Sequence, residues 1–239
     1  MEQERDRRQA MKKIVFIVEG ESEDEFVKRI IRPFFVSKGI PFYHIESKII
    51  QISGGGHGFN NIEHFKNTIK PFLSRNDEPI ITSFIDHYRL NSERKLPGYN
   101  ECMAETNIGI KLGKMEGKLQ DMVQSIKPYR FFIPYIQQHE FETLLFADPE
   151  EGFDLEDERI KREIMNLCNF FDSIEDINCT PHGAPSVRLE AIYSKYRRRY
   201  NKGADAVDIA ELTTIGKMLE KCPRFKNWIY LLISETTKK

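Results

Sequence analysis

Residues 13–23, KIVFIVEGESE, decide the fold of this protein, because an unbroken apolar run passes here directly into a group of acids. The run KIVFIV is typical of a strand that is buried on both faces of a parallel sheet, and Glu19 marks its end. Ser22, with Glu25 three residues later, has the spacing of a capping box and predicts that a helix starts at once. The segment therefore predicts a strand, a tight turn and a helix.

The alternation of apolar runs and helical spacing continues along the chain. Pro134 lacks a backbone N–H, so it places the last predicted strand at an edge of the sheet or ends it. Strands that alternate with helices predict an α/β fold with a mostly parallel sheet flanked by helices. The further predicted strands are 45–52, 79–85 and 129–136, and the helices that follow the first two of them are 62–72 and 101–127.

The chain divides into three parts by its pattern. Residues 1–10 are charged and are expected to form a disordered or frayed tail, and residues 11–150 hold the α/β domain. From 151 to 239 the apolar residues recur at helical spacing, which predicts a helical C-terminal region packed on that domain. The acidic loop 149–152 is a candidate hinge, although one continuous globule also fits the pattern.

Composition excludes several classes of protein. The chain has 36 Lys and Arg against 37 Asp and Glu, a formal net charge of -1, which excludes a basic protein that coats nucleic acid. No apolar run approaches the ~20 residues of a membrane span, and no signal peptide is visible, so we expect a cytoplasmic protein without a membrane partner. The four cysteines have neither zinc-site nor disulfide-framework spacing.

Carboxylates follow three of the predicted strands. Glu19 and Asp86 come directly after apolar runs, and the pair Glu140 and Glu142 follows the last strand. Ligands of parallel sheets gather at the carboxyl ends of strands, where Mg²⁺ takes oxygen ligands and relieves the repulsion of crowded carboxylates. The alternative is that strands end at polar residues because they emerge into water. If the segment that carries Glu140 and Glu142 is extended, both side chains point to one site. If it is helical, only one of them can reach the site, and we favour Glu140.

These residues carry a resemblance to a known family. Residues 18–23, VEGESE, resemble the VEGxxD motif of Toprim domains, with Glu19 as the motif glutamate and Glu23 in place of the usual aspartate. Asp86-His87-Tyr88 is similar to the second Toprim motif, DxD, but Tyr88 occupies the second acidic position. The wider pattern over residues 13–232 resembles bacterial domain of unknown function family 4276, a Toprim-like group related to nucleases of the OLD (overcoming lysogenization defect) class. This resemblance rests on the segments 84–88, 139–142, 184–186 and 222–225.

The resemblance implies a nuclease that depends on Mg²⁺ or Mn²⁺. It implies Glu19, Asp86 and Glu140 as catalytic residues, and as metal ligands Glu19, Glu23, Asp86, Glu140 and Glu142. It further implies a defence or toxin-like effector that cleaves DNA or RNA, tRNA included, with an ABC-like or AAA ATPase as partner, because this chain has no ATP-binding motif of its own. The alternative, which Tyr88 motivates, is a noncatalytic regulatory or nucleic-acid-binding subunit, and a homodimer is left open.

A basic stretch in the C-terminal third is the second candidate site. Residues 188–202 hold six cations against the single acid Glu190, with tyrosines interleaved. Phosphates attract such cations and unpaired bases stack on tyrosine, so the stretch predicts a nucleic-acid contact. A solvated basic helix face with buried tyrosines is the equal alternative. The residues predicted to contact nucleic acid are Arg188, Lys195, Tyr196, Arg197, Arg198 and Arg199.

Overall fold

The computed structural model describes residues 11–52, 56, 58–177 and 183–238. The predicted tail at 1–10, most of the glycine-rich segment 53–58 and Cys179 lie outside these residues. Within them, the five strands form one sheet in the order β2-β1-β3-β4, with β5 also paired to β3. All ladders are parallel, as predicted. The strands are β1 (Ile14–Val18), β2 (Ile45–Ile49), β3 (Ile80–Asp86), β4 (Phe132–Ile133) and β5 (Ile136–Gln137).

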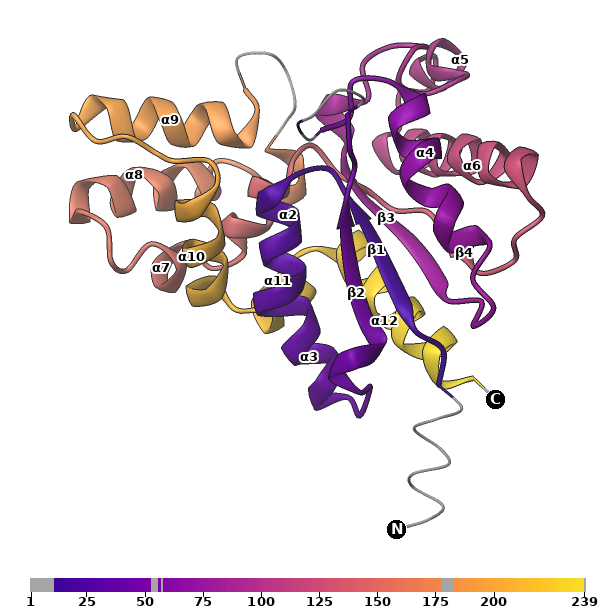
Figure 1. Cartoon of the computed structure of the whole chain (residues 1–239). Helices are drawn as coiled ribbons and strands as arrows, with labels where there is room; N and C mark the ends of the chain where they lie inside the picture. Colours follow the sequence, from indigo (N-terminus) through magenta and orange to yellow (C-terminus); the bar gives the residue numbers. More distant parts are fainter. Residues whose placement is uncertain (1–10, 53–55, 57, 178–182, 239) are drawn as a thin grey trace.

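Helices cover both faces of the sheet, so the domain has three layers (Figure 1). Val15 and Ile17 of β1 face one apolar core, and Phe16 and Val18 face the other, as the period of two in a strand requires. The first core is closed by α4 (Ile62–Leu73), α5 (Tyr99–Met103) and α6 (Ile108–Ile126). In the described part of the chain, no helix combines the length and the apolar character that crossing a membrane requires.

The second face carries the first crossover and the helical C-terminal part. The first crossover is α2 (Glu21–Phe26), a π-helical turn (Val27–Ile31) and α3 (Arg32–Ser37). The C-terminal part holds α7 (Pro149–Gly152), α8 (Glu158–Asn169), α9 (Pro185–Lys195), α10 (Ala204–Thr213), α11 (Ile215–Lys221) and α12 (Pro223–Thr237). Short 3₁₀ helices span Phe42–His44, His87–Arg89, Phe141–Ala147 and Ile174–Asp176. This arrangement confirms the predicted flanking helices and helical C-terminal part.

Trp228 of α12 joins the C-terminal part to the sheet. Its ring stacks on Tyr135 with centroids 4.1 Å apart and meets Phe16 of β1 edge-on at 5.8 Å. Its indole N–H donates to Oγ1 of Thr82 in β3 at 2.8 Å. One apolar core therefore runs from β1 across residue 150 into the last helix.

Three predicted elements have different boundaries in the structure. The first helix begins at Glu21 with Gly20 as its N-cap, because the side chain that reaches back to the cap is Glu23 rather than Glu25. The predicted helix 101–127 is the pair α5 and α6, with Asn107 capping the second of them. The predicted strand 129–136 is split, since β4 ends at Ile133, directly before Pro134.

The split strand still lies at the edge of the sheet, as Pro134 predicts. Side chains of β3 replace part of the interrupted ladder. Thr82 Oγ1 donates to the carbonyl of Ile133 at 2.6 Å, and Ser83 Oγ donates to the carbonyl of Tyr135 at 2.9 Å. These bonds keep the chain in register up to the segment that carries Glu140.

Candidate metal centre at the carboxyl edge of the sheet

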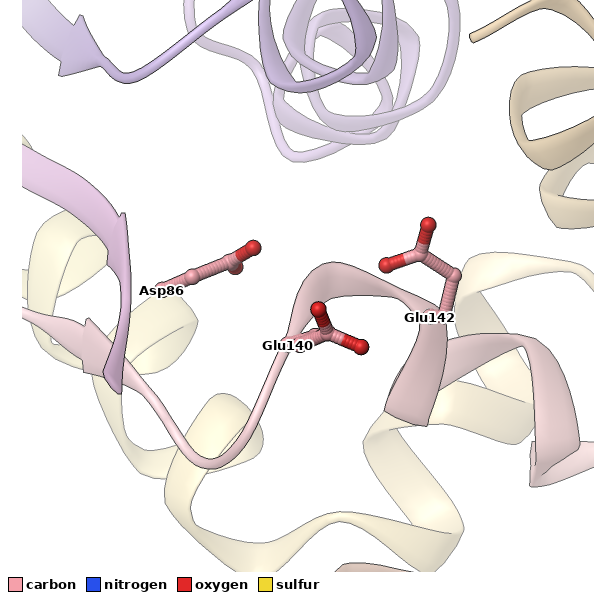
Figure 2. A group of neighbouring side chains, drawn as sticks. All are labelled: Asp86, Glu140 and Glu142. Carbon is pink, nitrogen blue, oxygen red and sulfur yellow. The ribbon is translucent and has the colours of Figure 1, made fainter. Parts of the chain in front are cut away.

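Three buried carboxylates meet where β3 and β5 end. Asp86 is the last residue of β3, Glu140 caps the 3₁₀ helix that follows β5, and Glu142 lies in its first turn. Each offers an oxygen within 4.8 Å of the other two. Figure 2 shows the side chains from the strand end and from the 3₁₀ segment turned toward one shared space. Both glutamates therefore reach the site, because Glu140 is extended, with φ -143° and ψ 165°, and the helix begins only after it.

Each carboxylate has a different set of partners. Asp86 Oδ1 accepts a hydrogen bond from the backbone N–H of Phe141 at 2.9 Å. Glu140 Oε2 accepts two, from the N–H of Ser186 at 3.0 Å and from its hydroxyl at 2.7 Å. Glu142 is fully buried, and neither of its oxygens has a hydrogen-bond donor within the part of the chain that the structure describes. Such a group costs free energy unless a ligand satisfies it.

Lys202, which follows α9, brings a positive charge to the same place. Its Nζ lies 3.1 Å from Oε1 of Glu140 and 3.4 Å from Oε1 of Glu142. Burial opposes the charged form of this lysine, but the surrounding carboxylates outweigh burial and raise its pKa. Its backbone carbonyl accepts a hydrogen bond from the hydroxyl of Ser22 at 3.2 Å, so the first turn of α2 helps to hold the lysine in position.

Glu19 and Glu23 line a cleft that opens beside Asp86. Glu23 Oε2 accepts the N–H of Gly20 at 2.9 Å, and Glu19 Oε1 lies 3.4 Å from Nε of Arg89. The other oxygen of Glu19 is buried and has no hydrogen-bond donor among the described residues. The cleft has a volume of about 350 Å³ and is lined by Glu19, Gly20, Ser22, Glu23, Gly58, Phe59, Asn60, Asp86, Arg89, Lys95, Lys202 and Gly203.

The sheet topology explains why these acids converge. The chain leaves β1 toward β2 on one side and returns to β3 on the other, so β1 and β3 are central neighbours. Glu19 follows β1 and Asp86 ends β3, so both stand at the point where strand order reverses. Crevices of parallel sheets that bind ligands form at this point.

Electrostatics at this edge favour the protonated acids. Burial, with the neighbouring Glu23 carboxylate, raises the pKa of Glu19 to about 8. Burial raises the pKa of Glu142 to about 7 against the opposing effect of Lys202. Burial also raises the pKa of Asp86 and of Glu23. A cation that enters the site would stabilise the ionised forms of all four.

Tyr88, which occupies the second acidic position of the DxD-like motif, contributes its backbone. Its N–H donates to the carbonyl of His139 at 3.0 Å. This bond ties the loop after Asp86 to the residue before Glu140. His139 itself has a left-handed φ of 63°, a conformation that is uncommon for a side chain other than glycine, asparagine or aspartate. The sharp turn it makes lets Glu140 follow β5 directly into the site.

Of the basic stretch, Lys202 reaches the acidic cluster, and the remaining predicted contacts are mostly engaged elsewhere or solvated. Arg188 donates to the carbonyl of Gly183, and Lys195 forms an ion pair with Glu163. The hydroxyl of Tyr196 also donates to Glu163, at 2.6 Å. Arg197, Arg198 and Arg199 are exposed, whereas Tyr193 and Tyr200 are only 2% and 4% exposed. The arginines are thus available to a polyanion, and these two tyrosines belong to the core.

Two partners of the metal centre were missed from sequence, Ser186 and Lys202. Ser186 lies 46 residues and Lys202 62 residues from Glu140 along the chain. Neither belongs to a local motif with a chemical meaning, so no spacing rule connects them to the acids. Ser186 lies in the segment 184–186 that carries part of the resemblance to the family, and Lys202 is one of the six cations of the basic stretch, but neither signal connects them to the acids.

Comparison with known proteins gives a family. Neither a curated protein nor a solved structure matches the chain. The sequence model of a family described as "Domain of unknown function (DUF4276)" matches residues 18–233. The match includes the carboxylates of the metal centre together with Ser186 and Lys202, and it covers most of the chain. The chain therefore belongs to the DUF4276 family.

Proposed function

We propose that this protein is a metal-dependent phosphodiesterase that cleaves nucleic acid, a Toprim-like nuclease. One observation carries the proposal: the fully buried carboxylate of Glu142 accepts no hydrogen bond from a described residue, and the single cation Lys202, 3.4 Å from its Oε1, faces three carboxylates whose ligand atoms lie within 4.8 Å of one another. A core would not retain such a group for packing. A divalent cation would supply the missing partner.

The charges of the site fit one divalent ion. Five carboxyl groups, Glu19, Glu23, Asp86, Glu140 and Glu142, face the three cations Arg89, Lys95 and Lys202, so two negative charges remain when all are ionised. The donor atoms are all oxygens, with no histidine or cysteine in the group. Oxygen-only sites suit Mg²⁺ and Mn²⁺.

Asp86, Glu140 and Glu142 would hold the ion. When bound, it would stabilise charge on a phosphoryl oxygen and lower the pKa of a water molecule. Glu19 is placed on the cleft side to accept a proton at Oε2, because that oxygen has no described donor and the pKa of the carboxyl is raised to about 8. Ser186 fixes the orientation of Glu140, and Lys202 balances charge next to it.

The biological setting of the proposal comes from the resemblance to Toprim nucleases. An effector in bacterial defence, acting on DNA or RNA with a partner ATPase, is the setting that fits this class. The exposed Arg197, Arg198 and Arg199, a few residues before Lys202, support a polyanionic substrate.

A noncatalytic regulatory subunit is the second candidate, and one observation favours it. Lys202 already bridges Glu140 and Glu142, so part of the buried charge is compensated without a metal. In that case the acids and the lysine form a structural ion-pair network, and Tyr88 marks the loss of a ligand.

The test compares purified wild type with Asp86→Asn and Glu142→Gln, and with Glu190→Gln as control, because Glu190 is an exposed carboxylate of α9. Plasmid DNA and total tRNA are incubated with Mg²⁺ or Mn²⁺, with and without a co-expressed ATPase, and Mn²⁺ binding is measured by calorimetry. We expect cleavage and metal binding in wild type and control, and at least about a 100-fold loss of cleavage in both site variants. Cleavage that survives both substitutions, or a wild type that neither binds metal nor cleaves, contradicts the proposal.

A further inference from the structure

The cleft beside the metal centre has a second, cationic wall. Arg89 and Lys95 line it, and both come from the loop between β3 and α5. The loop directly follows Asp86, the last residue of β3. One continuous segment therefore supplies an acid to one side of the cleft and two cations to the other.

The cationic wall is held in place by its neighbours. Leu90 and Leu96 flank the two cations in sequence and are 1% and 0% exposed, so they anchor the loop in the core. Between them, the carbonyl of Arg94 accepts the N–H of Ile62 at 3.0 Å, at the start of α4. The loop is thus held at three points, and these contacts fix the backbone positions of Arg89 and Lys95.

These two cations are weakly paired within the described part of the chain. Arg89 meets only Glu19, through Nε at 3.4 Å, and about half of its side chain is exposed. The side chain of Lys95 forms no hydrogen bond or ion pair with any residue that the structure describes, and its favourable electrostatic partner is Glu19. In contrast, two lysines of the neighbouring α6 are tightly paired, Lys118 with Glu101 at 2.7 Å and Lys114 with Glu105 at 3.0 Å. The cleft therefore keeps two cations available to a ligand.

We propose that Arg89 and Lys95 form a phosphate subsite that binds a phosphate of the substrate backbone next to the phosphate that is cleaved. The inference rests on the proposed function and names its substrate class: a polynucleotide with at least two neighbouring phosphodiesters. A substrate with a single phosphodiester would not reach the subsite.

The chemistry of the two side chains fits a phosphodiester. Its two free oxygens match the planar guanidinium fork, whose outer N–H groups form no bond with the described residues while Nε faces Glu19. The ammonium of Lys95 adds a compact charge that needs no fixed direction. The cleft volume of about 350 Å³ lies within the range of ligand pockets, roughly 300–1,000 Å³.

The test compares two substrates. The variants Arg89→Gln and Lys95→Gln are measured against Arg130→Gln and Lys38→Gln, controls that remove an exposed cation outside the cleft. KM and kcat are determined for a fluorescent oligonucleotide and for bis(p-nitrophenyl) phosphate, which has one phosphodiester. We expect KM for the oligonucleotide to rise roughly 10-fold in each site variant. Both controls should change by less than about twofold on either substrate. Because Arg89 and Lys95 also act on Glu19, some loss on the single-phosphodiester substrate is expected in the site variants, but the rise in KM should be clearly larger for the oligonucleotide. An equal loss on both substrates, or no change on the oligonucleotide, overturns the subsite.

A binding measurement separates this inference from the proposed function. Fluorescence anisotropy of the same oligonucleotide is recorded in Ca²⁺ at several salt concentrations, with circular dichroism to confirm the fold. Each substitution should reduce the slope of log K against log salt by roughly 0.7, the value for one contact to a single strand. If this holds while no variant or wild type ever hydrolyses DNA or RNA, the subsite stands and the nuclease fails. If hydrolysis is present and binding ignores both substitutions, the nuclease stands and the subsite is wrong.

Discussion

The two ends of the central sheet use the same kinds of charged residues in opposite ways. At the amino end, Arg75 binds both oxygens of Glu46, at 2.7 and 3.1 Å, and also pairs with Asp77 at 2.7 Å. Lys13 adds a contact to Asp77 at 3.2 Å. The hydrogen bond from Arg75 lowers the pKa of Asp77 to about 2. Both acids of this group, Glu46 and Asp77, therefore have a countercharge.

At the carboxyl end, the acids lack part of the hydrogen-bond partners that they need. Burial raises the pKa of Glu142 to about 7, and neither oxygen finds a hydrogen-bond donor in the described residues. The opposite pKa shifts at the two ends show that an acid alone says little about its role. Complete pairing at the surface stabilises the fold modestly, whereas incomplete pairing in the interior costs stability and marks a place for a ligand. Four predictions test this contrast.

The largest effect is expected for Lys202→Gln in metal-free protein. The change leaves Glu140 and Glu142 without the only close cation that the described residues provide, so we expect a loss of about 3–5 kcal/mol in the free energy of unfolding, or roughly 10 °C in Tm. Saturating Mg²⁺ should restore part of it. Lys195→Gln is the matched control, because its ion pair with Glu163 is exposed and worth at most about 1 kcal/mol. Equal losses in the two variants would show that the interior pair is not special.

The second prediction concerns pH. The pKa values of Glu19 and Glu142 in the folded protein, about 8 and about 7, lie above the ordinary value of 4.5. The folded state therefore holds more protons than the unfolded state, and stability falls as pH rises from 4.5 to about 8. Thermal melts in EDTA should show a fall of several kcal/mol over this window. Mg²⁺ should diminish this fall, and Glu142→Gln should reduce its slope below about pH 7, where Glu19 still contributes. A stability that rises over this window would contradict the placement of these acids.

The third prediction concerns metal affinity in the variant Ser186→Ala. The substitution removes the hydroxyl donor to Glu140 but keeps the backbone N–H, so Glu140 loses one of two bonds that orient it. Loss of a group that orients a ligand typically costs 10–100-fold in metal affinity, and calorimetric titration with Mn²⁺ should give about this decrease. Ser194→Ala, at an exposed position of the same helix, should leave the affinity unchanged. An unaltered affinity in Ser186→Ala would mean that Glu140 does not ligate the ion.

The smallest effect is expected at the amino end of the sheet. Arg75→Gln breaks the contacts to Glu46 and Asp77, which are more than a third exposed, so we expect a loss of about 1 kcal/mol and no change in metal binding. The depressed pKa of Asp77 further means that this stabilisation is present above pH 3.8 and is lost as pH falls toward about 2. Acid denaturation of wild type and variant measures it. A change in Mn²⁺ affinity would show that the two ends are coupled.

Much of the fold and part of the acidic cluster could be predicted from local sequence. Apolar runs of strand length located β1, β2 and β3, and the acids that follow β1 and β3 are the ones that meet in the cleft. Glu140 could be chosen, but whether Glu142 joins it depends on where the 3₁₀ helix begins. The hydrogen bond from Tyr88 to the carbonyl of His139 helps to set that point, and it joins residues 51 apart that no periodicity relates.

The sequence by itself determined the parallel sheet and the acids at its carboxyl edge, because both follow from short-range alternation of apolar and polar residues. Only the tertiary structure decided which partners those acids have. Ser186 and Lys202 reach Glu140 from the C-terminal helices, and Arg89 and Lys95 turn toward the cleft because Leu90 and Leu96 are anchored in the core. Contacts between distant segments are set by how whole elements pack, and the free energy of that packing is distributed over the entire core rather than written in any motif.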